Sequence, residues 1–305
     1  MLHTARFYID LTKDEAYLIE RNLGITLDQL KSKIEKKFNG ITAWVIQKYE
    51  VRLFFTIDFV KLLNKSNIQE SDYVQTERKI DEFILFVFQD ASFLDRICMT
   101  RLDYRRDVQI PMVERELLLS LYRKTTSKHC HQEKDLRYKT TLYFNSKSII
   151  SCVYDKDLEA REERGKVEWY EDSVLRLEVR ILNQHLKYKK YRQGKEKCLK
   201  EYFKDELFKE YMEKYFGEIL FNGDFYKINK ARTIINNSQL KDSEREKLLL
   251  FLCEISKHGF DYVKEKYSTY YRKKFLKQLN SLNINPILIP KSRKSPSVVK
   301  NPFQF

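Results

Sequence analysis

Two hydrophobic patterns alternate along the first 185 residues, one with the period of a strand and one with the period of a helix. Ala5–Asp10, Ile41–Gln47 and Val51–Phe59 are short segments rich in β-branched and aromatic residues, so we expect them to be strands. Thr12 precedes a run with helical spacing and is expected to cap a helix that starts at Lys13. The start of the chain therefore predicts strands and helices in alternation.

The same two patterns continue to about residue 185. Further helices are expected at Leu27–Phe38 and Ser71–Phe88, and from Pro111 to about Arg123, because proline is tolerated at the first helical position. The polar stretch Thr125–Arg137 is expected to be a loop. Strands are expected where apolar residues alternate, at Arg96–Ile110, Lys139–Asn145, Ile149–Lys156 and Val174–Leu182.

After residue 185 the pattern becomes helical and highly charged. Lys187–Phe216, Ser243–Lys257 and Lys264–Asn280 are expected to be helices, and the last fifteen residues show no periodicity. We therefore predict an α+β fold with a mostly antiparallel sheet and flanking helices in residues 1–185. A helical domain at 186–290 and a disordered basic tail at 291–305 are expected to follow.

The charge of the chain favours a polyanionic partner. Lys and Arg total 58 against 44 Asp and Glu, which gives a formal net charge of +14. Nucleic acid is the commonest partner for such a surplus, and a membrane surface is a weaker alternative. A lysine-rich composition inherited from an AT-rich genome would explain many lysines, but it would not explain the excess over acidic residues.

The cysteines and the apolar runs indicate the compartment. The five cysteines are widely spaced and form no CxxC pair, which is typical of reduced thiols in a cytoplasm. No apolar run reaches the ~18 residues of a membrane-spanning helix, and the first residues lack the apolar core of a signal peptide. We therefore expect a cytoplasmic protein without a membrane partner. The chain has no GxxxxGK motif, which disfavours an ATPase.

Two of the predicted strands carry unusual side chains. In Val174–Leu182, strand alternation puts Arg176, Glu178 and Arg180 on one face, opposite an apolar face. In Ile149–Lys156, the same rule places Tyr154 at the end of an apolar face. Three ionisable residues on one strand face are costly unless they line a wet cleft or pair with one another. Periodicity alone leaves two alternatives open, a functional cleft and a solvated edge strand.

The order of three short motifs resembles a known family. Thr141-Leu-Tyr-Phe-Asn-Ser-Lys-Ser148 is followed by Tyr154-Asp-Lys-Asp-Leu-Glu159 and then by Leu175-Arg-Leu-Glu-Val179. This order is similar to that of the gene II/X family of phage and plasmid rolling-circle replication proteins. It is more distantly similar to staphylococcal-type plasmid initiators and to conjugative relaxases. The resemblance is strongest over residues 96–182, and it extends weakly to the stretch Tyr270–Pro290.

The resemblance implies a nicking and rejoining enzyme with a rolling-circle initiator-like nuclease domain. Such proteins cut one strand at a replication origin, remain joined to it through a 5′-phosphotyrosine and later reseal the ends. The matching nucleophile is Tyr154, with Lys156 beside it, because a phenolate is both a good nucleophile and a good leaving group. The resemblance also implies DNA contacts and a divalent metal, Mg²⁺ or Mn²⁺; the matching residues are Arg176, Lys147 and Arg180 for DNA and Asp103 and Glu178 for the metal.

Several alternatives remain at these positions. Tyr143 and Tyr170 are further tyrosines in the region, and Asp107 and Glu159 are further candidates for metal ligands. Many relatives carry Gly-Ser-Arg where this chain has Asn145-Ser146-Lys147, a departure at the turn where the resemblance implies a phosphate contact. His129-Cys130-His131 has the His-apolar-His form that binds metal in HUH endonucleases, but it lies in a polar stretch that favours a surface loop.

The expected partner is origin DNA, single- or double-stranded. A host helicase and a second copy of the chain, forming a homodimer, are further candidate partners. The basic, tyrosine-containing segments Lys187–Arg192 and Lys264–Lys277 are expected to help bind the origin. Two other functions stay open: a conjugative relaxase of the same type, and a non-catalytic DNA-binding control protein of a plasmid or phage.

Overall fold

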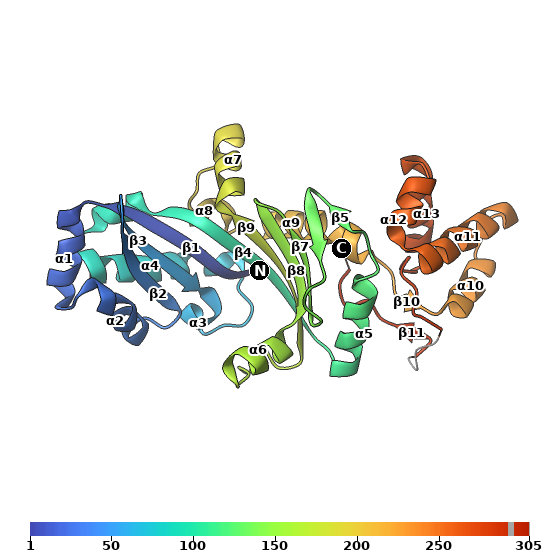
Figure 1. Ribbon diagram of the computed structural model, residues 1–305, viewed down its shortest axis with the longest axis horizontal. Coiled ribbons are helices and arrows are strands. Elements are labelled where there is room, and N and C mark those ends of the chain that lie inside the picture. The colour runs from blue at the N-terminus through green and yellow to red at the C-terminus, as the bar shows by residue number, and fades with distance from the viewer. Residues whose placement is uncertain (292–295, 305) are drawn as a thin grey trace. The chain divides into compact units, whose positions relative to one another are not determined.

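The protein has a mixed α/β structure with a large sheet and many helices (Figure 1). The computed structural model describes residues 1–291 and 296–304. Strands of the large sheet are hydrogen-bonded in the order β2-β3-β1-β4-β9-β8-β7-β6-β5. The chain divides into two compact units, and each is described by itself. Unit 1 comprises Met1–Arg106, Lys147–Ile150 and Glu178–Glu210; unit 2 comprises Asp107–Ser146, Ser151–Leu177 and Tyr211–Phe305.

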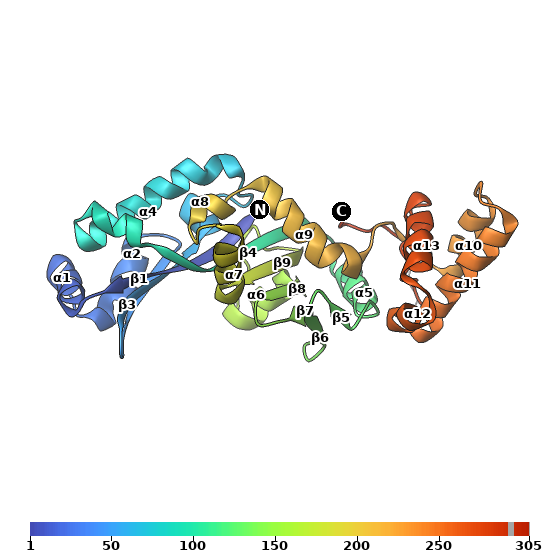
Figure 2. The ribbon, with the colours of Figure 1, turned by 90° about the horizontal axis from the view of Figure 1, so that it is seen from above.

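Unit 1 begins with three antiparallel strands, β1 (Leu2–Leu11), β2 (Ile41–Gln47) and β3 (Val51–Asp58). Phe7 and Phe55 face each other across β1 and β3, and their buried rings stack with centroids 5.0 Å apart. Helix α4 (Tyr73–Phe88) packs on this apolar face, where the ring centroids of Phe83 and Phe55 are 5.1 Å apart. Figure 2 shows α4 along one side of β1 and β3, and Figure 1 looks onto the other side of these strands.

The first helix of unit 1 forms as the sequence predicts. Thr12 caps α1 (Lys13–Leu23) through a capping box, because its hydroxyl accepts from the Glu15 amide while the Glu15 carboxylate accepts from the Thr12 amide. The other short helices of the unit are η1 (Leu27–Gln29), α2 (Leu30–Lys37), α3 (Phe59–Leu63), η2 (Glu70–Asp72), η3 (Ala91–Arg96), α7 (Asn183–Gln193) and α8 (Leu199–Tyr202).

Two long strands, β4 (Cys98–Gln109) and β9 (Val174–Leu182), contribute residues to both units. Within unit 1, β4 pairs antiparallel with β1 and is the neighbour of β9. The pairing of β1 with β4 has two register shifts, one between Leu2 and Thr4 and one between Arg6 and Phe7. Such irregularities redirect side chains locally, and they occur often beside functional sites.

Unit 2 carries the remaining strands of the large sheet and most of the C-terminal helices. β8 (Ile149–Asp155) is followed in the sheet order by β7 (Thr141–Asn145), β6 (Gln132–Asp135) and β5 (Lys128–His129). A second sheet pairs β10 (Phe225–Tyr226) with β11 (Val298–Val299). The helices are α5 (Met112–Tyr122), α6 (Lys156–Arg164), α9 (Asp205–Leu220), which also enters unit 1, α10 (Ile228–Asn236), α11 (Asp242–His258), α12 (Phe260–Lys266) and α13 (Thr269–Ser281).

The coarse prediction of a mixed fold with a mostly antiparallel sheet is confirmed. The strands predicted at Val174–Leu182 and at Ile41–Gln47 both have the predicted bounds. The loop predicted at Thr125–Arg137 is wrong, because it contains the β5–β6 hairpin. The single helix predicted at Lys187–Phe216 is instead three helices, α7, α8 and α9, and α6 was not predicted.

The C-terminal segment differs from the disordered tail expected at 291–305. Val298–Val299 form β11, and Phe303 is fully buried. Asn301 fixes the segment by donating its side-chain amide to the Phe221 carbonyl at 2.8 Å. The segment that makes these contacts is too short to show a periodic pattern in the sequence. Residues 292–295 and 305 lie outside the described part of the chain.

The division into units also differs from the predicted boundary after residue 185, because β8 and β9 pass through both units. Among residues 1–291 and 296–304, none of the helices combines the length and the apolar character needed to cross a membrane.

Candidate functional site

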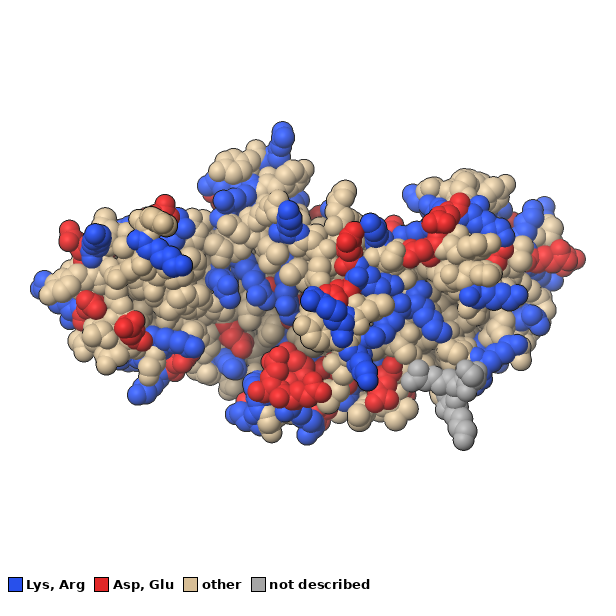
Figure 3. Space-filling view, viewed as in Figure 1, with Lys and Arg blue, Asp and Glu red and all other residues tan. Residues whose placement is uncertain are grey.

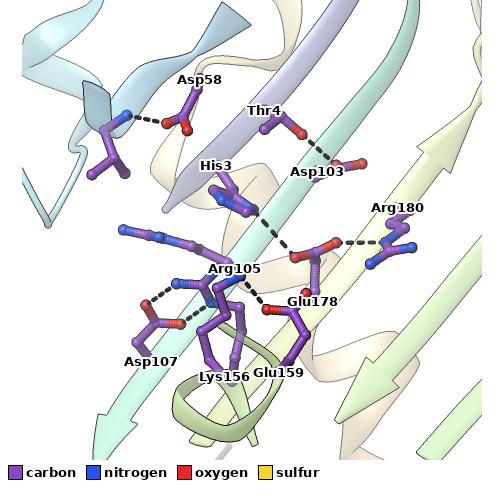
Figure 4. A network of polar contacts seen from close by, with 12 residues as sticks. His3, Thr4, Asp58, Asp103, Arg105, Asp107, Lys156, Glu159, Glu178 and Arg180 are labelled. Atoms are coloured by element: carbon purple, nitrogen blue, oxygen red, sulfur yellow. Dashed lines mark hydrogen bonds and ion pairs between the residues drawn. The ribbon is translucent and has the colours of Figure 1, made fainter. Parts of the chain in front are cut away.

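Asp103 lies in a buried acid–base cluster of unit 1. Strand alternation puts Arg101 and Asp103 on one face of β4, and Thr4 lies opposite Asp103 on β1. Arg101 donates to the two carboxylate oxygens from Nε at 2.8 Å and from Nη2 at 2.6 Å. The Thr4 hydroxyl also donates to Asp103 (Figure 4). Asp103 is only 1% exposed. Its charge is therefore balanced by protein groups rather than by water.

Glu178 forms a second buried pair on β9. Its Oε1 accepts from Arg180 Nε at 2.5 Å, and its Oε2 lies 3.2 Å from His3 Nδ1. Glu178, like Asp103, is 1% exposed. His3 was not among the predicted site residues, and it lies at the register shift between Leu2 and Thr4 in β1. Only the observed strand pairing brings this N-terminal residue to Glu178.

The two carboxylates share one electrostatic environment. Burial alone would lower the pKa of Arg101, but hydrogen bonding to Asp103 and attraction by Asp103 and Glu178 raise that pKa above its ordinary value. Arg180 opposes this rise through like-charge repulsion. We call this group the carboxylate cluster; its members are His3, Thr4, Arg101, Asp103, Glu178 and Arg180.

The carboxylate cluster contains Asp103 and Glu178, the two residues expected to bind the metal. A divalent cation needs several oxygen ligands that point to one centre. Here the oxygens of Asp103 bind Arg101 and Thr4, while those of Glu178 face Arg180 and His3. Across residues 1–291 and 296–304, no three His, Cys, Asp or Glu side chains gather as metal ligands. In this arrangement the carboxylate oxygens contact protein cations and a hydroxyl, and the divalent metal stays a prediction.

Tyr154 lies in unit 2, on β8, and is 5% exposed. The guanidinium carbon of Arg176, on the neighbouring strand β9, lies 6.0 Å from the centroid of the Tyr154 ring. Arg176 is fully buried and donates to Asp107 from Nε at 2.8 Å and from Nη2 at 2.9 Å. The predicted nucleophile and the predicted phosphate-binding arginine are therefore neighbours. We call Tyr154, Arg176 and Asp107 the tyrosine cluster.

Lys156 has its own acidic partners in unit 2. It begins α6, where its ammonium pairs with Glu159 and lies 3.4 Å from Glu171 Oε1. Arg164 also donates to Glu171. Burial opposes ionisation of Glu171, but Arg164 and Lys156 outweigh it and lower the pKa of that carboxyl below its ordinary value. None of the contacts described for Lys156 joins it to Tyr154.

A buried arginine that the sequence analysis missed supports the end of β8. Arg115, on α5, donates from Nε to Asp155 at 2.8 Å and from Nη2 to Asp157 at 3.2 Å. Asp155 also caps α6, because its Oδ1 accepts from the Leu158 amide at 3.0 Å. These contacts fix the residue that follows Tyr154. Helical periodicity does not identify Arg115, because this residue lies among the apolar leucines of α5.

The remaining candidates are dispersed. Lys147 is exposed in the turn before β8. Tyr143 lies on β7 with its ring 5.9 Å from that of Tyr138, and Tyr170 lies against the exposed Trp169. The two alternative metal ligands are bound by cations: Asp107 by Arg176 and Glu159 by Lys156.

The two histidines of His129-Cys130-His131 have different environments. His129 is buried, and its Nε2 lies 2.8 Å from the Lys214 carbonyl oxygen. His131 is exposed in the β5–β6 turn, where both it and Cys130 have positive φ angles. The tight turn separates the two imidazoles, so they do not share a strand face as a metal-binding pair would.

The chain was compared with known proteins. No protein-family model matches it, and no curated protein shows a significant match.

Proposed function

We propose that this protein cleaves and rejoins one strand of DNA through a tyrosine, as the rolling-circle initiators that it resembles do. The observation that supports this most is the 6.0 Å approach of the Arg176 guanidinium to the Tyr154 ring. A phenol with an ordinary pKa near ~10 needs a nearby cation to ionise. A guanidinium also matches the geometry of a phosphate, so Arg176 suits both tasks.

The proposed reaction is a transesterification. The phenolic oxygen of Tyr154 bonds to the phosphorus while the bond from phosphorus to the 3′ oxygen breaks. The phenolic proton ends on the released 3′ hydroxyl, and the 5′ phosphate remains on the tyrosine. Because one phosphodiester replaces another, the reverse reaction reseals the strand without ATP. The net charge of +14 is consistent with a DNA substrate.

Burial of the tyrosine cluster sets a condition on this reaction. Tyr154 is 5% exposed and Arg176 is bound to Asp107, so the strand can reach them only after local opening. The same observation favours a second candidate function. A DNA-binding protein that uses the tyrosine cluster for stability alone would need no such opening.

The proposal is tested by the label that becomes attached to the protein. Single-stranded oligonucleotides of random sequence are labelled at the 3′ end in one sample and at the 5′ end in another, and each is incubated with the protein and Mg²⁺ or Mn²⁺. A 5′-phosphotyrosine retains the downstream fragment, so only the 3′ label should migrate with the protein on a denaturing gel. Tyr154→Phe should lose this band.

Tyr143→Phe and Tyr170→Phe are the matched controls, and both should keep the band. If Tyr154→Phe still forms the adduct while Tyr143→Phe does not, the assignment of the nucleophile is wrong. If DNA binds but neither label attaches, the non-catalytic function is favoured instead.

A further inference from the structure

The outward side of the first three strands in unit 1 carries a continuous row of aromatic rings. Trp44 on β2 stacks on Phe54 of β3 with centroids 5.9 Å apart and planes 13° apart, and Tyr8 on β1 lies 6.0 Å from Phe54. The strand register explains the row, because Trp44 pairs with Phe54 and Phe54 pairs with Tyr8. All three rings are partly exposed. We call this row the aromatic face.

Three cations lie against the aromatic face. The Arg6 guanidinium carbon is 5.7 Å from the Trp44 ring centroid, that of Arg52 is 5.0 Å from the Tyr8 ring centroid, and the Lys197 ammonium is 5.9 Å from the Tyr8 ring centroid. Figure 3 looks onto the outward side of these strands and shows lysine and arginine side chains, with some acidic ones, among uncharged surface. Aromatic planes interleaved with cations have the composition of a binding surface for unpaired bases and phosphates.

The charges on this face are balanced unevenly. Arg52 pairs with Asp10 at 2.6 Å and also with Glu50, so much of its charge is neutralised. Arg6 is exposed, and in the part of the chain that the structure describes its guanidinium makes no hydrogen bond or ion pair. Arg6 is therefore the cation most ready to bind a phosphate beside the Trp44 ring.

Tyr8 is suited to stacking rather than to chemistry. A hydrogen bond with Cys98, together with burial and the charge of Asp10, raises the pKa of Tyr8 to about 12. The phenol therefore stays protonated and neutral at physiological pH. A neutral ring can stack on a base without repelling the adjacent phosphates.

A purely structural role explains these rings only in part. Cross-strand aromatic pairs do stabilise a sheet, and β2 is its edge strand. That role does not require the rings to form a row across three strands, nor does it require Arg6 at one end without an acidic partner. Both features are expected of a surface that binds a polyanion with accessible bases.

We propose that the aromatic face binds single-stranded nucleic acid, with unpaired bases against Trp44, Phe54 and Tyr8 and a phosphate at Arg6. A duplex hides the faces of its bases, because they are stacked on one another, so it should bind more weakly. This inference rests on the proposed function insofar as DNA is the substrate, and it adds a group of residues in unit 1 that binds the strand.

Trp44 provides a direct probe of the contact. The chain has two tryptophans, so Trp169→Phe leaves Trp44 as the only one. In the Trp169→Phe protein, titration with oligothymidine should quench the tryptophan fluorescence in a saturable way, since a stacked base quenches an indole. A duplex at the same concentration should quench it much less. Binding of a labelled oligonucleotide without any change in Trp44 fluorescence would overturn the inference.

Substitutions then separate stacking from charge. In an anisotropy titration, Trp44→Leu should weaken binding by about tenfold, and Trp44→Phe should largely restore it. Arg6→Gln should lower the slope of log K against log salt by about 0.7, as expected for one lost phosphate contact. The controls are Tyr17→Leu on α1 and Arg78→Gln on α4, which are exposed and not part of the aromatic face, and both should bind like the parent.

The readouts also separate this inference from the proposed function. Tyr154→Phe should leave the quenching of Trp44 unchanged while it removes the covalent adduct. Quenching without any adduct would leave the aromatic face standing and reject the nicking activity. If Trp44→Leu binds as tightly as the parent, the aromatic face is not the binding surface, whatever the adduct assay shows.

Discussion

The tyrosine cluster of unit 2 and the aromatic face of unit 1 are organised in opposite ways. Tyr154 and Arg176 are buried, and Arg176 is already bound to Asp107. On the aromatic face the rings are partly exposed, and Arg6 has no acidic partner among the described residues. A strand could bind the second region without any rearrangement, whereas it could reach the first only after local opening.

This difference indicates that binding and chemistry have different energetic requirements in this protein. Buried ion pairs hold a geometry well but resist opening, because removing one partner leaves an uncompensated charge. Exposed rings and cations cost little to rearrange and contribute their free energy only when a ligand arrives. We therefore expect substitutions in unit 2 to change stability first, and substitutions on the aromatic face to change affinity first.

The largest effect is expected from Arg115→Met in unit 2. The side chains of Arg115 and of its partner Asp155 are 4% and 3% exposed, and the substitution removes the cation that pairs with Asp155, whereas Asp157 keeps its ion pair with Arg161. The free energy of unfolding should fall by about 3–5 kcal/mol, measured by urea denaturation. Arg52→Gln on the aromatic face is the control; its ion pairs are exposed, and their loss should cost less than about 1 kcal/mol.

A double substitution checks the physical reason. Asp155→Asn should relieve part of the loss caused by Arg115→Met, because the stranded charge is then absent. If Arg115→Met and Arg52→Gln lowered the free energy of unfolding equally, the expected difference between the two regions would be wrong. Such a result would mean that the Arg115 network is as solvated as the surface pairs.

Local patterns in the sequence predicted much of the fold but little of the site. The helix cap at Thr12 and the strand Val174–Leu182 depend on residues close in sequence, and both were predicted correctly. His3 and Arg115 were missed, since their roles depend on β1 pairing with β4 and on α5 packing near β8. Pairing between distant segments leaves no periodic trace in a single sequence.

The aromatic face shows the same limit of prediction from a single sequence. Trp44 and Phe54 were recognised as strand residues, but the pattern could not say which face of the sheet a helix would cover. The observed packing of Phe83 on Phe55 settles this, because it assigns the core to the opposite side of β3. Asp103 and Glu178, the two residues expected to bind a metal, do lie in one cluster. Their carboxylate oxygens, however, contact arginines and His3.

A medium effect that depends on pH is expected from Glu171→Gln in unit 2. Arg164 and Lys156 lower the folded-state pKa of Glu171, so its stabilising contribution is present above the unfolded pKa of about 4.3 and is lost as the pH falls through the folded value. At neutral pH the variant should be less stable than the parent by about 1–2 kcal/mol, and the gap should shrink below about pH 4. Denaturation at several pH values measures the gap; a gap that does not change with pH would assign the loss to packing.

The smallest effect on stability, and the sharpest test of the comparison, is expected from the pair Asp10→Asn with Glu50→Gln. These exposed carboxylates neutralise Arg52, so their removal should change the free energy of unfolding by less than about 1 kcal/mol. It should, however, tighten the binding of single-stranded DNA at low salt, because a cation is released beside the Tyr8 ring. The slope of log K against log salt should steepen by about 0.7 for one added phosphate contact. Unchanged affinity would mean that the strand does not pass Tyr8, and the binding surface would then be limited to Trp44, Phe54 and Arg6.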